Sequence, residues 1–255
     1  MSESSGAGGR FMSCLADDIS GSTRYWVVPH VYLCVSHRQV VLLNVLADKY
    51  LSLSAQAAAG LHAVIEGWPL PEQLGCPSHS DIAPKPKVLT ELIARGLLVS
   101  DAASGKPATP IAAMSPRRAA GTDYLTEPLA ASRRDMMMAL KAFAVACYMK
   151  RYWHLSHIIA RVRTRNVVHS DMPYEALRFT ALFERLRPLL YPANDACLFD
   201  SLVLGEFLAR YGIFPRWMFG VQANPFAAHC WLQVGDIALN DREEQSQGLS
   251  IILAI

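Results

Sequence analysis

A segment rich in proline and glycine divides this chain and limits the folds open to it. Residues 102–122 hold three prolines and two glycines, a composition typical of a linker between folded regions. Residues 23–101 and 123–255 therefore each need a core of their own. Hydrophobic residues make up 52% of the chain, which is ample for two cores. Residues 1–22 are small and polar, and we expect them to be disordered.

The region before the linker has the pattern of a small sheet combined with helices. Apolar runs rich in β-branched residues predict strands. Ser54 is a suitable N-cap for an alanine-rich helix that ends at Gly67, and a second helix ends at Gly96. The predicted elements are strands at 25–35, 38–46, 50–53 and 97–99, and helices at 55–66 and 88–95.

Beyond the linker, the pattern changes to helices followed by strands. Apolar residues recur every three or four positions between Met136 and Cys147, which is typical of a helix with one buried face. The predicted helices are 132–165, 174–190 and 196–211, and the predicted strands are 216–221, 228–234 and 237–240. The two regions together predict an α+β fold.

Charge and cysteine spacing argue against several functional classes. The chain has 24 Lys and Arg against 22 Asp and Glu, and this small excess gives no general argument for nucleic acid binding. Its six cysteines form no C-x-x-C pair, which favours reduced thiols in a cytoplasm over a zinc ribbon or a disulfide framework. The most apolar run, 136–149, is too short to span a bilayer, and residues 1–10 lack a signal-peptide pattern. We expect a cytoplasmic protein without nucleic acid or membrane partners.

Three residues of the second region could carry nucleophilic chemistry. Cys197 follows Asn194 and Asp195, either of which could cap a helix, so its thiol would sit in the first turn. The unpaired N–H groups and the helix dipole there favour a thiolate, the nucleophilic form. His229, on a predicted strand, could accept and later deliver a proton. Asp241 lies twelve residues later and could orient the imidazole ring.

The hairpin that joins His229 to Asp241 must meet a geometric condition. A strict two-residue turn at Gly235-Asp236 would pair His229 with Arg242 and send Asp241 to the other face of the sheet. A working triad therefore predicts a three-residue turn or a β-bulge at this point.

Structural interpretations exist for these and for other candidate residues. A cysteine near a helix start is usually a small core residue, and strand alternation points Cys230 away from His229, toward a core. His154 and His157 have no carboxylate near them in sequence, so packing or surface roles are favoured over a metal site. Residues 133–165 carry eight basic side chains and one acidic, which suits either an anionic partner or, more simply, a solvated helix face.

The motifs of both regions resemble one known family. The stretch that combines Cys197-Leu198, Gly220-Val221, Pro225-Phe226-x-x-His229-x-Trp231 and Asn240-Asp241 resembles the lasso-peptide B proteins, which are transglutaminase-like cysteine peptidases. Residues 40–66, with Asp48-Lys49-Tyr50-Leu51-x-Leu53 and the alanine-rich helix after them, are similar to a precursor-recognition element of the PqqD-like winged-helix type.

The resemblance implies an enzyme built from two domains. A small winged-helix domain with a three-stranded sheet would occupy residues 23–101. A transglutaminase- or papain-like domain would occupy 123–255, with Cys197 at a helix N-terminus and His229 and Asp241 on antiparallel strands. The first would bind the leader of a lasso precursor peptide. The second would hydrolyse the leader–core amide before an asparagine-synthetase-like cyclase forms the macrolactam.

The mode of leader binding follows from the predicted sheet. Its third strand would lie at an edge, where unpaired N–H and C=O groups can accept an extended peptide. The residues expected to bind the leader are Tyr50, Leu51, Ser52, Leu53 and Leu92. This chemistry requires no metal or other cofactor, and it leaves a dependence on ATP open because no phosphate-binding glycine loop occurs.

Two other functions fit the same residues. A transglutaminase or an arylamine N-acetyltransferase also uses Cys, His and Asp for acyl transfer, with an amine in place of water as the acceptor. A peptide-binding adaptor with an inactive triad would show no turnover at all. Independently of these functions, the sheet of the first region could stabilise the catalytic domain instead of binding a leader.

Overall fold

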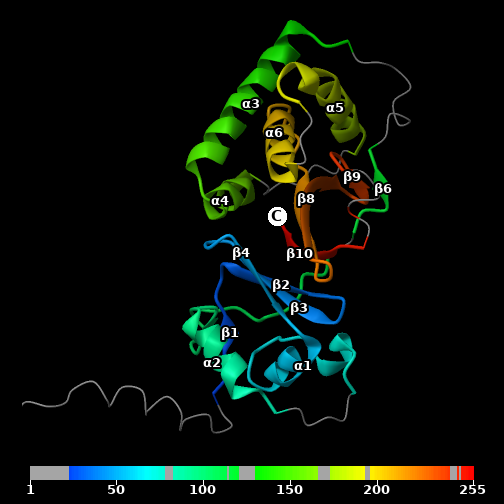
Figure 1. Cartoon of the computed structure of the whole chain (residues 1–255). Coiled ribbons are helices and arrows are strands. Elements are labelled where there is room, and N and C mark those ends of the chain that lie inside the picture. The colour runs from blue at the N-terminus through cyan, green and yellow to red at the C-terminus, as the bar shows by residue number, and fades with distance from the viewer. Residues whose placement is uncertain are drawn as a thin grey trace, which may run out of the picture. The chain divides into compact units, whose positions relative to one another are not determined.

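The computed structural model describes residues 23–77, 83–113, 115–120, 130–165, 173–192, 196–241, 246 and 248–255 (Figure 1). The expected disorder of 1–22 lies outside these residues. The helices are α1 (Ala55–Ala58), α2 (Pro86–Ala94), α3 (Arg133–Tyr152), α4 (Leu155–Arg165), α5 (Pro173–Leu186) and α6 (Cys197–Ala209), with 3₁₀ helices η1 (Ala59–Ala63), η2 (Pro71–Leu74) and η4 (Arg187–Leu189). The strands are β1 (Trp26–Val27), β2 (Val31–Ser36), β3 (Gln39–Asn44), β4 (Lys49–Leu53), β5 (Leu98–Val99), β6 (Arg118–Ala119), β7 (Arg216–Gln222), β8 (Ala227–Val234), β9 (Ile237–Ala238) and β10 (Ser250–Ala254). The fold class is α+β, as predicted.

Contacts divide the described residues into two units. The first comprises the residues up to Pro29 together with Ser54–Thr109, and in it β1 pairs with β5 in antiparallel register. Here the predicted helix at 55–66 is shorter, because α1 ends at Ala58 and 3₁₀ turns follow. The indole N–H of Trp68 donates to the carbonyl of Ala58 at 3.0 Å, which occupies the acceptor that a continuing α-helix would use.

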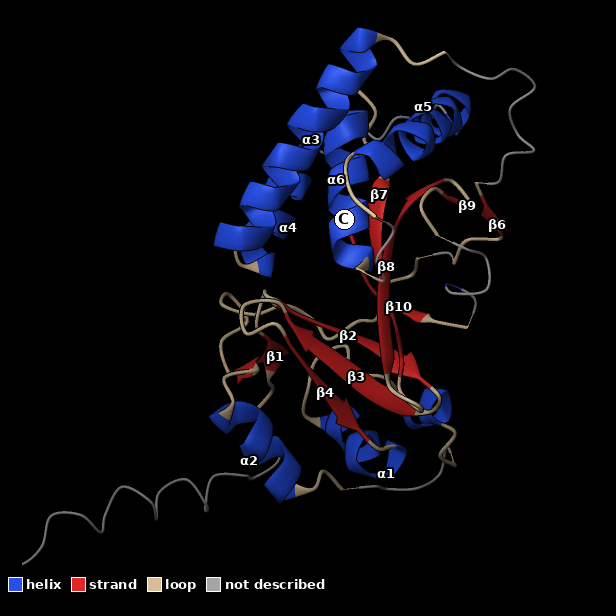
Figure 2. Cartoon of the chain, turned by 45° about the horizontal axis from the view of Figure 1, so that its top comes forward, coloured by secondary structure: helices blue, strands red, loops and turns tan. Residues whose placement is uncertain are grey.

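The second unit comprises His30–Leu53 and Pro110–Ile255 and contains two sheets (Figure 2). One has the strand order β2-β3-β4, so β4 lies at an edge, as predicted. The other has the order β10-β7-β8-β9-β6, in which only the β6–β9 pair is parallel. Two of its strands were not predicted: β10, and β6, which lies within the expected linker.

The three-stranded sheet shares a core with the C-terminal helices. Cys34, Val41 and Leu43 from this sheet belong to the same buried cluster as Phe207 and Phe219. Val31, Val40 and Leu42 of the same sheet are buried outside this cluster. The predicted boundaries divide the chain into a first domain at 23–101, a linker at 102–122 and a second domain at 123–255. These domain boundaries stay a prediction.

Helix α6 is the central element of the second unit. It packs against α3, α5 and β8 (Figure 1), and most of its residues are buried, including Leu204 and Phe207 at 0% exposure. Burial of such side chains stabilises a fold by about 1.5–3 kcal/mol each. The helix that carries Cys197 is therefore held by packing against two helices and a strand. The predicted helix at 132–165 is instead two helices, α3 and α4, because the backbone at Trp153 is extended.

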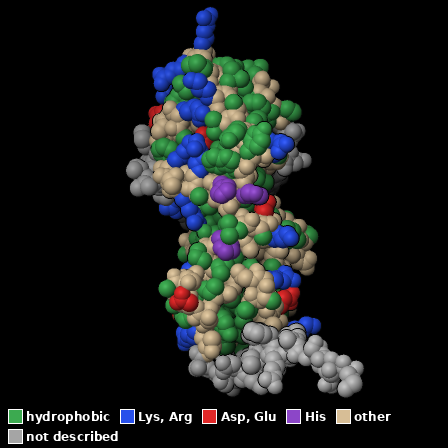
Figure 3. Space-filling model, turned by 90° about the vertical axis from the view of Figure 1, so that its left-hand side faces the viewer, with side chains coloured by type: hydrophobic (Ala, Val, Ile, Leu, Met, Phe, Trp, Pro, Cys, Tyr) green, Lys and Arg blue, Asp and Glu red, His purple; other side chains and the backbone are tan. Residues whose placement is uncertain are grey.

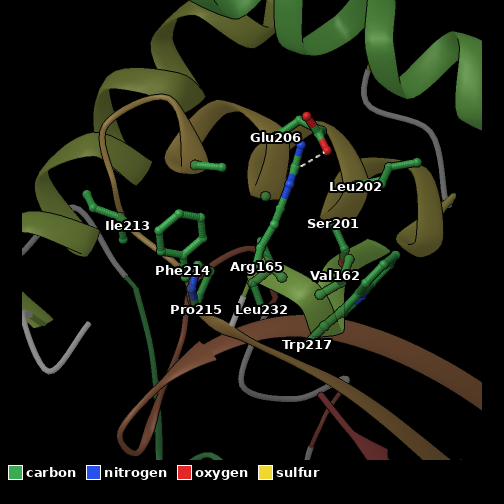
Figure 4. A pocket seen from close by; sticks show the side chains of 12 residues that line it. Val162, Arg165, Ser201, Leu202, Glu206, Ile213, Phe214, Pro215, Trp217 and Leu232 are labelled. Carbon is green, nitrogen blue, oxygen red and sulfur yellow. Dashed lines mark hydrogen bonds and ion pairs between the residues drawn. The ribbon is translucent and has the colours of Figure 1, made fainter. Parts of the chain in front are cut away.

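A buried glutamate binds α4 to α6. Glu206 is 3% exposed, and its carboxylate is 2.5 Å from Nη1 of Arg165, 3.4 Å from Nε of Arg161 and 3.5 Å from Nη1 of Arg210 (Figure 4). The cavity drawn beside these residues measures about 30 Å³, which is the share of one water molecule. It is a gap in packing and too small for a ligand.

None of the described helices is long and apolar enough to cross a bilayer.

Replacing Glu206 by alanine should lower the free energy of unfolding by about 3 kcal/mol or more, because three arginines lose their buried counter-charge. Urea denaturation followed by circular dichroism measures this. The matched control is Glu175→Ala, which removes a partly exposed surface pair with Arg178 and should cost less than about 1 kcal/mol. Equal losses in the two variants would contradict a structural role for the Glu206 cluster.

Candidate active site

The candidate nucleophile lies at the first position of a buried helix. Helix α6 begins at Cys197, and Ala196 holds the N-cap position without a side-chain capping bond. The caps we expected, Asn194 and Asp195, lie outside the described residues. The placement of the thiol in the first turn is confirmed. The positive end of the helix dipole there favours a negative charge on sulfur.

The imidazole of His229 bridges the thiol and a carboxylate. Nε2 of His229 is 2.9 Å from Oδ1 of Asp241, whose side chain is fully buried, whereas that of His229 is 20% exposed. The side chain of Cys197 is the other hydrogen-bond partner of the His229 side chain. The three residues therefore form the chain of contacts that general-base activation of a nucleophile requires.

The hairpin reaches this geometry in a way that corrects part of our prediction. Its turn has two residues, Gly235 and Asp236, because Val234 pairs with Ile237 and Gln233 with Ala238. The expected three-residue turn is therefore wrong. The expected β-bulge does not occur there either, because the pairing of β8 with β9 has no register shift. The backbone N–H of Leu239 still donates to the carbonyl of Leu232 at 2.8 Å, and the chain then bends over residues 239–241, which brings Asp241 to His229.

Asn240 holds the bend in place. Its side-chain oxygen accepts the backbone N–H of Leu232 at 2.8 Å, where a regular ladder would use a carbonyl group of the chain. Its side-chain nitrogen donates to Oγ of Ser201 on α6 at 2.9 Å, and Ser201 donates to the carbonyl of Cys230 at 3.3 Å. One side chain thus connects the Asp241 segment, the His229 strand and the Cys197 helix. We missed Asn240 as a positioning residue, although it directly precedes Asp241.

The surroundings of the pair favour a thiolate beside an imidazolium. Hydrogen bonding from the Cys230 thiol is the largest influence on Cys197, and with His229 it outweighs burial and lowers the pKa of Cys197 from 9.0 to about 4. Burial lowers the pKa of His229, but hydrogen bonds and negative charge from Asp241 and Cys197 outweigh it and raise that pKa from 6.5 to about 9. Both groups are therefore charged near neutral pH.

Cys230 has a role that strand alternation did not predict. It is buried at 3% exposure in the core, as expected. Its side chain and its backbone also both hydrogen-bond to Cys197. The hydrogen bond to Cys197 and burial raise the pKa of Cys230 well above 9.0, so this thiol keeps its proton and donates it. Two adjacent cysteines in the fold thus have opposite tasks: one is ionised and the other supports that charge.

The strand that carries His229 is itself tightly placed. His229 and Trp231 share one face as predicted, with ring centroids 5.9 Å apart and planes 23° from parallel. Trp231 donates to Oε1 of Gln233 at 2.9 Å on the same face. Gly220 lies opposite His229, and a Cβ there would meet the Trp231 ring at 3.0 Å. The glycine therefore leaves the space that the indole fills.

The predicted leader-binding residues fall in both units. Tyr50, Leu51, Ser52 and Leu53 lie on the edge strand β4 in the second unit, and the Tyr50 ring packs edge-on against Phe226 at 5.4 Å. Leu92 lies on α2 in the first unit and is 1% exposed. Their role in binding a leader stays a prediction.

The basic stretch has partly structural tasks. Arg161 and Arg165 pair with Glu206, and Arg163 donates to the Tyr32 hydroxyl at 2.6 Å. Its other basic residues are exposed, and basic side chains gather on the α3 and α4 side of the molecule (Figure 3). The rings of His154 and His157 pack together with their centroids 6.2 Å apart. Among the described residues, no group of three or more His, Cys, Asp or Glu could hold a metal ion.

The ion pair predicts a broad pH range for thiol reactivity. Cys197 is a thiolate above its pKa of about 4, and His229 is an imidazolium below its pKa of about 9. Alkylation of Cys197 by iodoacetamide, followed by peptide mass spectrometry, should stay fast between these limits and fall as the pH drops through about 4. Cys147, a half-buried thiol on α3, is the internal reference. If the alkylation rate of Cys197 already fell as the pH dropped through 9.0, the ordinary pKa of a thiol, that result would contradict the ion pair.

Removing the second thiol tests its support of the charge. In Cys230→Ala the thiolate loses its largest stabilising hydrogen bond, so the pKa of Cys197 should rise toward its ordinary value and alkylation should slow in the acid range. Cys34→Ala is the matched control, since Cys34 is also buried at 3% exposure in this unit. A pH profile of Cys230→Ala identical to that of the control would show that Cys230 only fills space.

Comparison with known proteins assigns the region that holds the candidate site to a known type of domain. Residues 137–254 match the model of a family described as the transglutaminase-like superfamily. This range contains Cys197, His229 and Asp241, and it does not reach residues 23–101, so the similarity to a precursor-recognition element stays a prediction. Searches of curated proteins and of solved structures found no match. The chain therefore contains a transglutaminase-like domain at residues 137–254, and the candidate residues Cys197, His229 and Asp241 lie within it.

Proposed function

We propose that this protein is a cysteine-dependent acyl-transfer enzyme, and more narrowly the leader peptidase of lasso-peptide biosynthesis. The observation that carries the proposal is the connected centre of Cys197, His229 and Asp241. The His229–Asp241 contact measures 2.9 Å, and the surroundings lower the pKa of the thiol to about 4. A transglutaminase-like domain is compatible with hydrolysis and with transfer to an amine.

The chemistry consists of two acyl-transfer steps. The Cys197 thiolate attacks the carbonyl carbon of the leader–core amide, and the imidazolium of His229 gives its proton to the departing core amine. The leader is then held as a thioester on sulfur. His229 next takes a proton from water as the oxygen attacks the thioester, which releases the leader carboxylate and restores the thiolate. The backbone N–H of Cys197, at the helix start, is a suitable oxyanion donor.

The edge strand β4 supports a peptide substrate. Burial raises the pKa of Tyr50 to about 12, and the nearby Cys230, Asp48 and Cys197 add to this effect. Tyr50 therefore lies close to the reacting thiol. A leader that pairs with β4 would continue toward Cys197 and raise the local concentration of the scissile bond. An asparagine-synthetase-like cyclase would then use the released amine, in the same cytoplasm.

The product identifies the reaction. The protein is incubated with the precursor peptide encoded beside its gene, with and without ATP, and the products are weighed by mass spectrometry. Fragments that have gained one water support the peptidase. Transfer of the acyl group to an added amine would instead indicate a transglutaminase, and acetylation of an arylamine from acetyl-coenzyme A would indicate an N-acetyltransferase. No turnover of any precursor would indicate an adaptor.

Cys197→Ala should abolish cleavage, because no other residue supplies the attacking sulfur, and should leave leader affinity unchanged in fluorescence anisotropy. Cys147→Ala is the matched control and should cleave at the wild-type rate, since Cys147 lies on α3. Persistent cleavage by Cys197→Ala would mean that the nucleophile is another group.

A further inference from the structure

A large cavity adjoins the first turn of α6. Its volume is about 280 Å³, and its wall includes Ala196 and Leu198, the two chain neighbours of Cys197. The opposite wall contains Trp153 and Leu155, where α3 passes into α4. The cavity therefore borders the chain neighbours of the candidate nucleophile, while Cys197 itself is not among its lining residues.

The volume distinguishes this cavity from a packing gap. Protein interiors contain few voids larger than one water molecule, and the cavity beside Glu206 measures only about 30 Å³. An engineered apolar cavity of about 150 Å³ accommodates benzene. A space of about 280 Å³ therefore has room for an aromatic or a branched aliphatic side chain.

The lining determines which side chains fit best. Seven of its nine lining residues are apolar: Trp153, Leu155, Ile158, Ala196, Leu198, Phe199 and Leu202. The two charged ones, Asp48 and Lys150, are exposed and of opposite sign, and Nζ of Lys150 lies 4.7 Å from the centre of the Phe199 ring. Burial of apolar surface is thus favoured, and neither sign of charge on a ligand is selected.

We propose that this cavity binds an apolar side chain of the acyl donor, within two residues of the carbonyl group that Cys197 attacks. The inference rests on the proposed acyl-transfer function. A peptide whose carbonyl lies at the thiol extends by at most about 3.3–3.6 Å per residue, so only side chains next to that carbonyl can enter a cavity bordered by Ala196 and Leu198. The cavity therefore determines specificity close to the bond that is broken.

Covalent probes test this without knowledge of the natural substrate. The probes are acetyl-dipeptidyl acyloxymethyl ketones with the sequences Gly-Gly, X-Gly and Gly-X, where X is Leu, Phe, Lys or Asp. The thiolate displaces the carboxylate of the probe, so each reaction adds one peptidyl-methyl group to sulfur. Intact mass and peptide mapping give the second-order rate constant of the reaction at Cys197. Iodoacetamide has no peptide side chain, so its rate measures the reactivity of the Cys197 thiol alone.

Two variants change the volume of the cavity, and all of the variants keep the Cys197 thiol. Leu155→Trp fills the space and Leu155→Ala enlarges it. Leu140→Trp adds the same indole at a site on α3 that is 50% exposed and outside the cavity. Iodoacetamide rates equal to wild type identify the variants that keep an intact centre.

We expect Leu or Phe at one of the two probe positions to raise the rate roughly tenfold or more over Gly, Lys and Asp. Leu155→Trp should remove that gain, whereas Leu155→Ala and Leu140→Trp should keep it. Rates at Cys197 that do not depend on X, or a gain that survives Leu155→Trp, would overturn the cavity proposal and leave the proposed function intact. A Cys197 that is no more reactive toward iodoacetamide than Cys147 would overturn both.

Discussion

The ion pair between the Cys197 thiolate and the His229 imidazolium is the interaction on which the rest of the site depends. Neither charge is stable in this setting alone, because burial acts against both ionised forms. Each charge offsets the cost of the other, and a hydrogen-bond donor or acceptor supports each side. Asp241, with its buried side chain, holds the imidazole from behind, and Cys230 donates to the sulfur.

Three separate elements must stay in register for that pair to exist. Helix α6 carries the sulfur, β8 carries the imidazole, and the bend after β9 carries the carboxylate. Asn240 and Ser201 join these elements through hydrogen bonds of 2.8, 2.9 and 3.3 Å. The buried Glu206 cluster fixes the same helix to α4. The site is thus placed by rigid elements, which is the condition for a preorganised catalytic centre.

The sheet of residues 31–53 lies in the same unit as the candidate active site. Cys34, Val41 and Leu43 of this sheet belong to the core that includes α6 and β7, and the edge strand β4 and the candidate nucleophile are parts of one unit. A peptide paired with β4 and the apolar cavity beside Cys197 would then act on the same substrate, one through backbone hydrogen bonds and the other through a side chain. Substrate selection in this proposal is divided between a strand edge and a cavity.

Sequence patterns alone were sufficient to predict most of the helices and strands in their order, the edge position of residues 50–53, the place of Cys197 in the first turn of a helix and the face shared by His229 and Trp231. These features follow from local periodicity, capping and turn chemistry, which act over a few residues. The way in which Asp241 reaches His229 could be seen only in the folded chain, because a side chain, Asn240, replaces a backbone acceptor across the hairpin. The hydrogen bonds of Cys230 to Cys197, the division of residues 133–165 by the extended Trp153, and the pairing of β6 with β9 were likewise decided by contacts between residues far apart in the chain. Local sequence patterns do not predict such contacts, because the energies of the contacts depend on which groups the fold brings together.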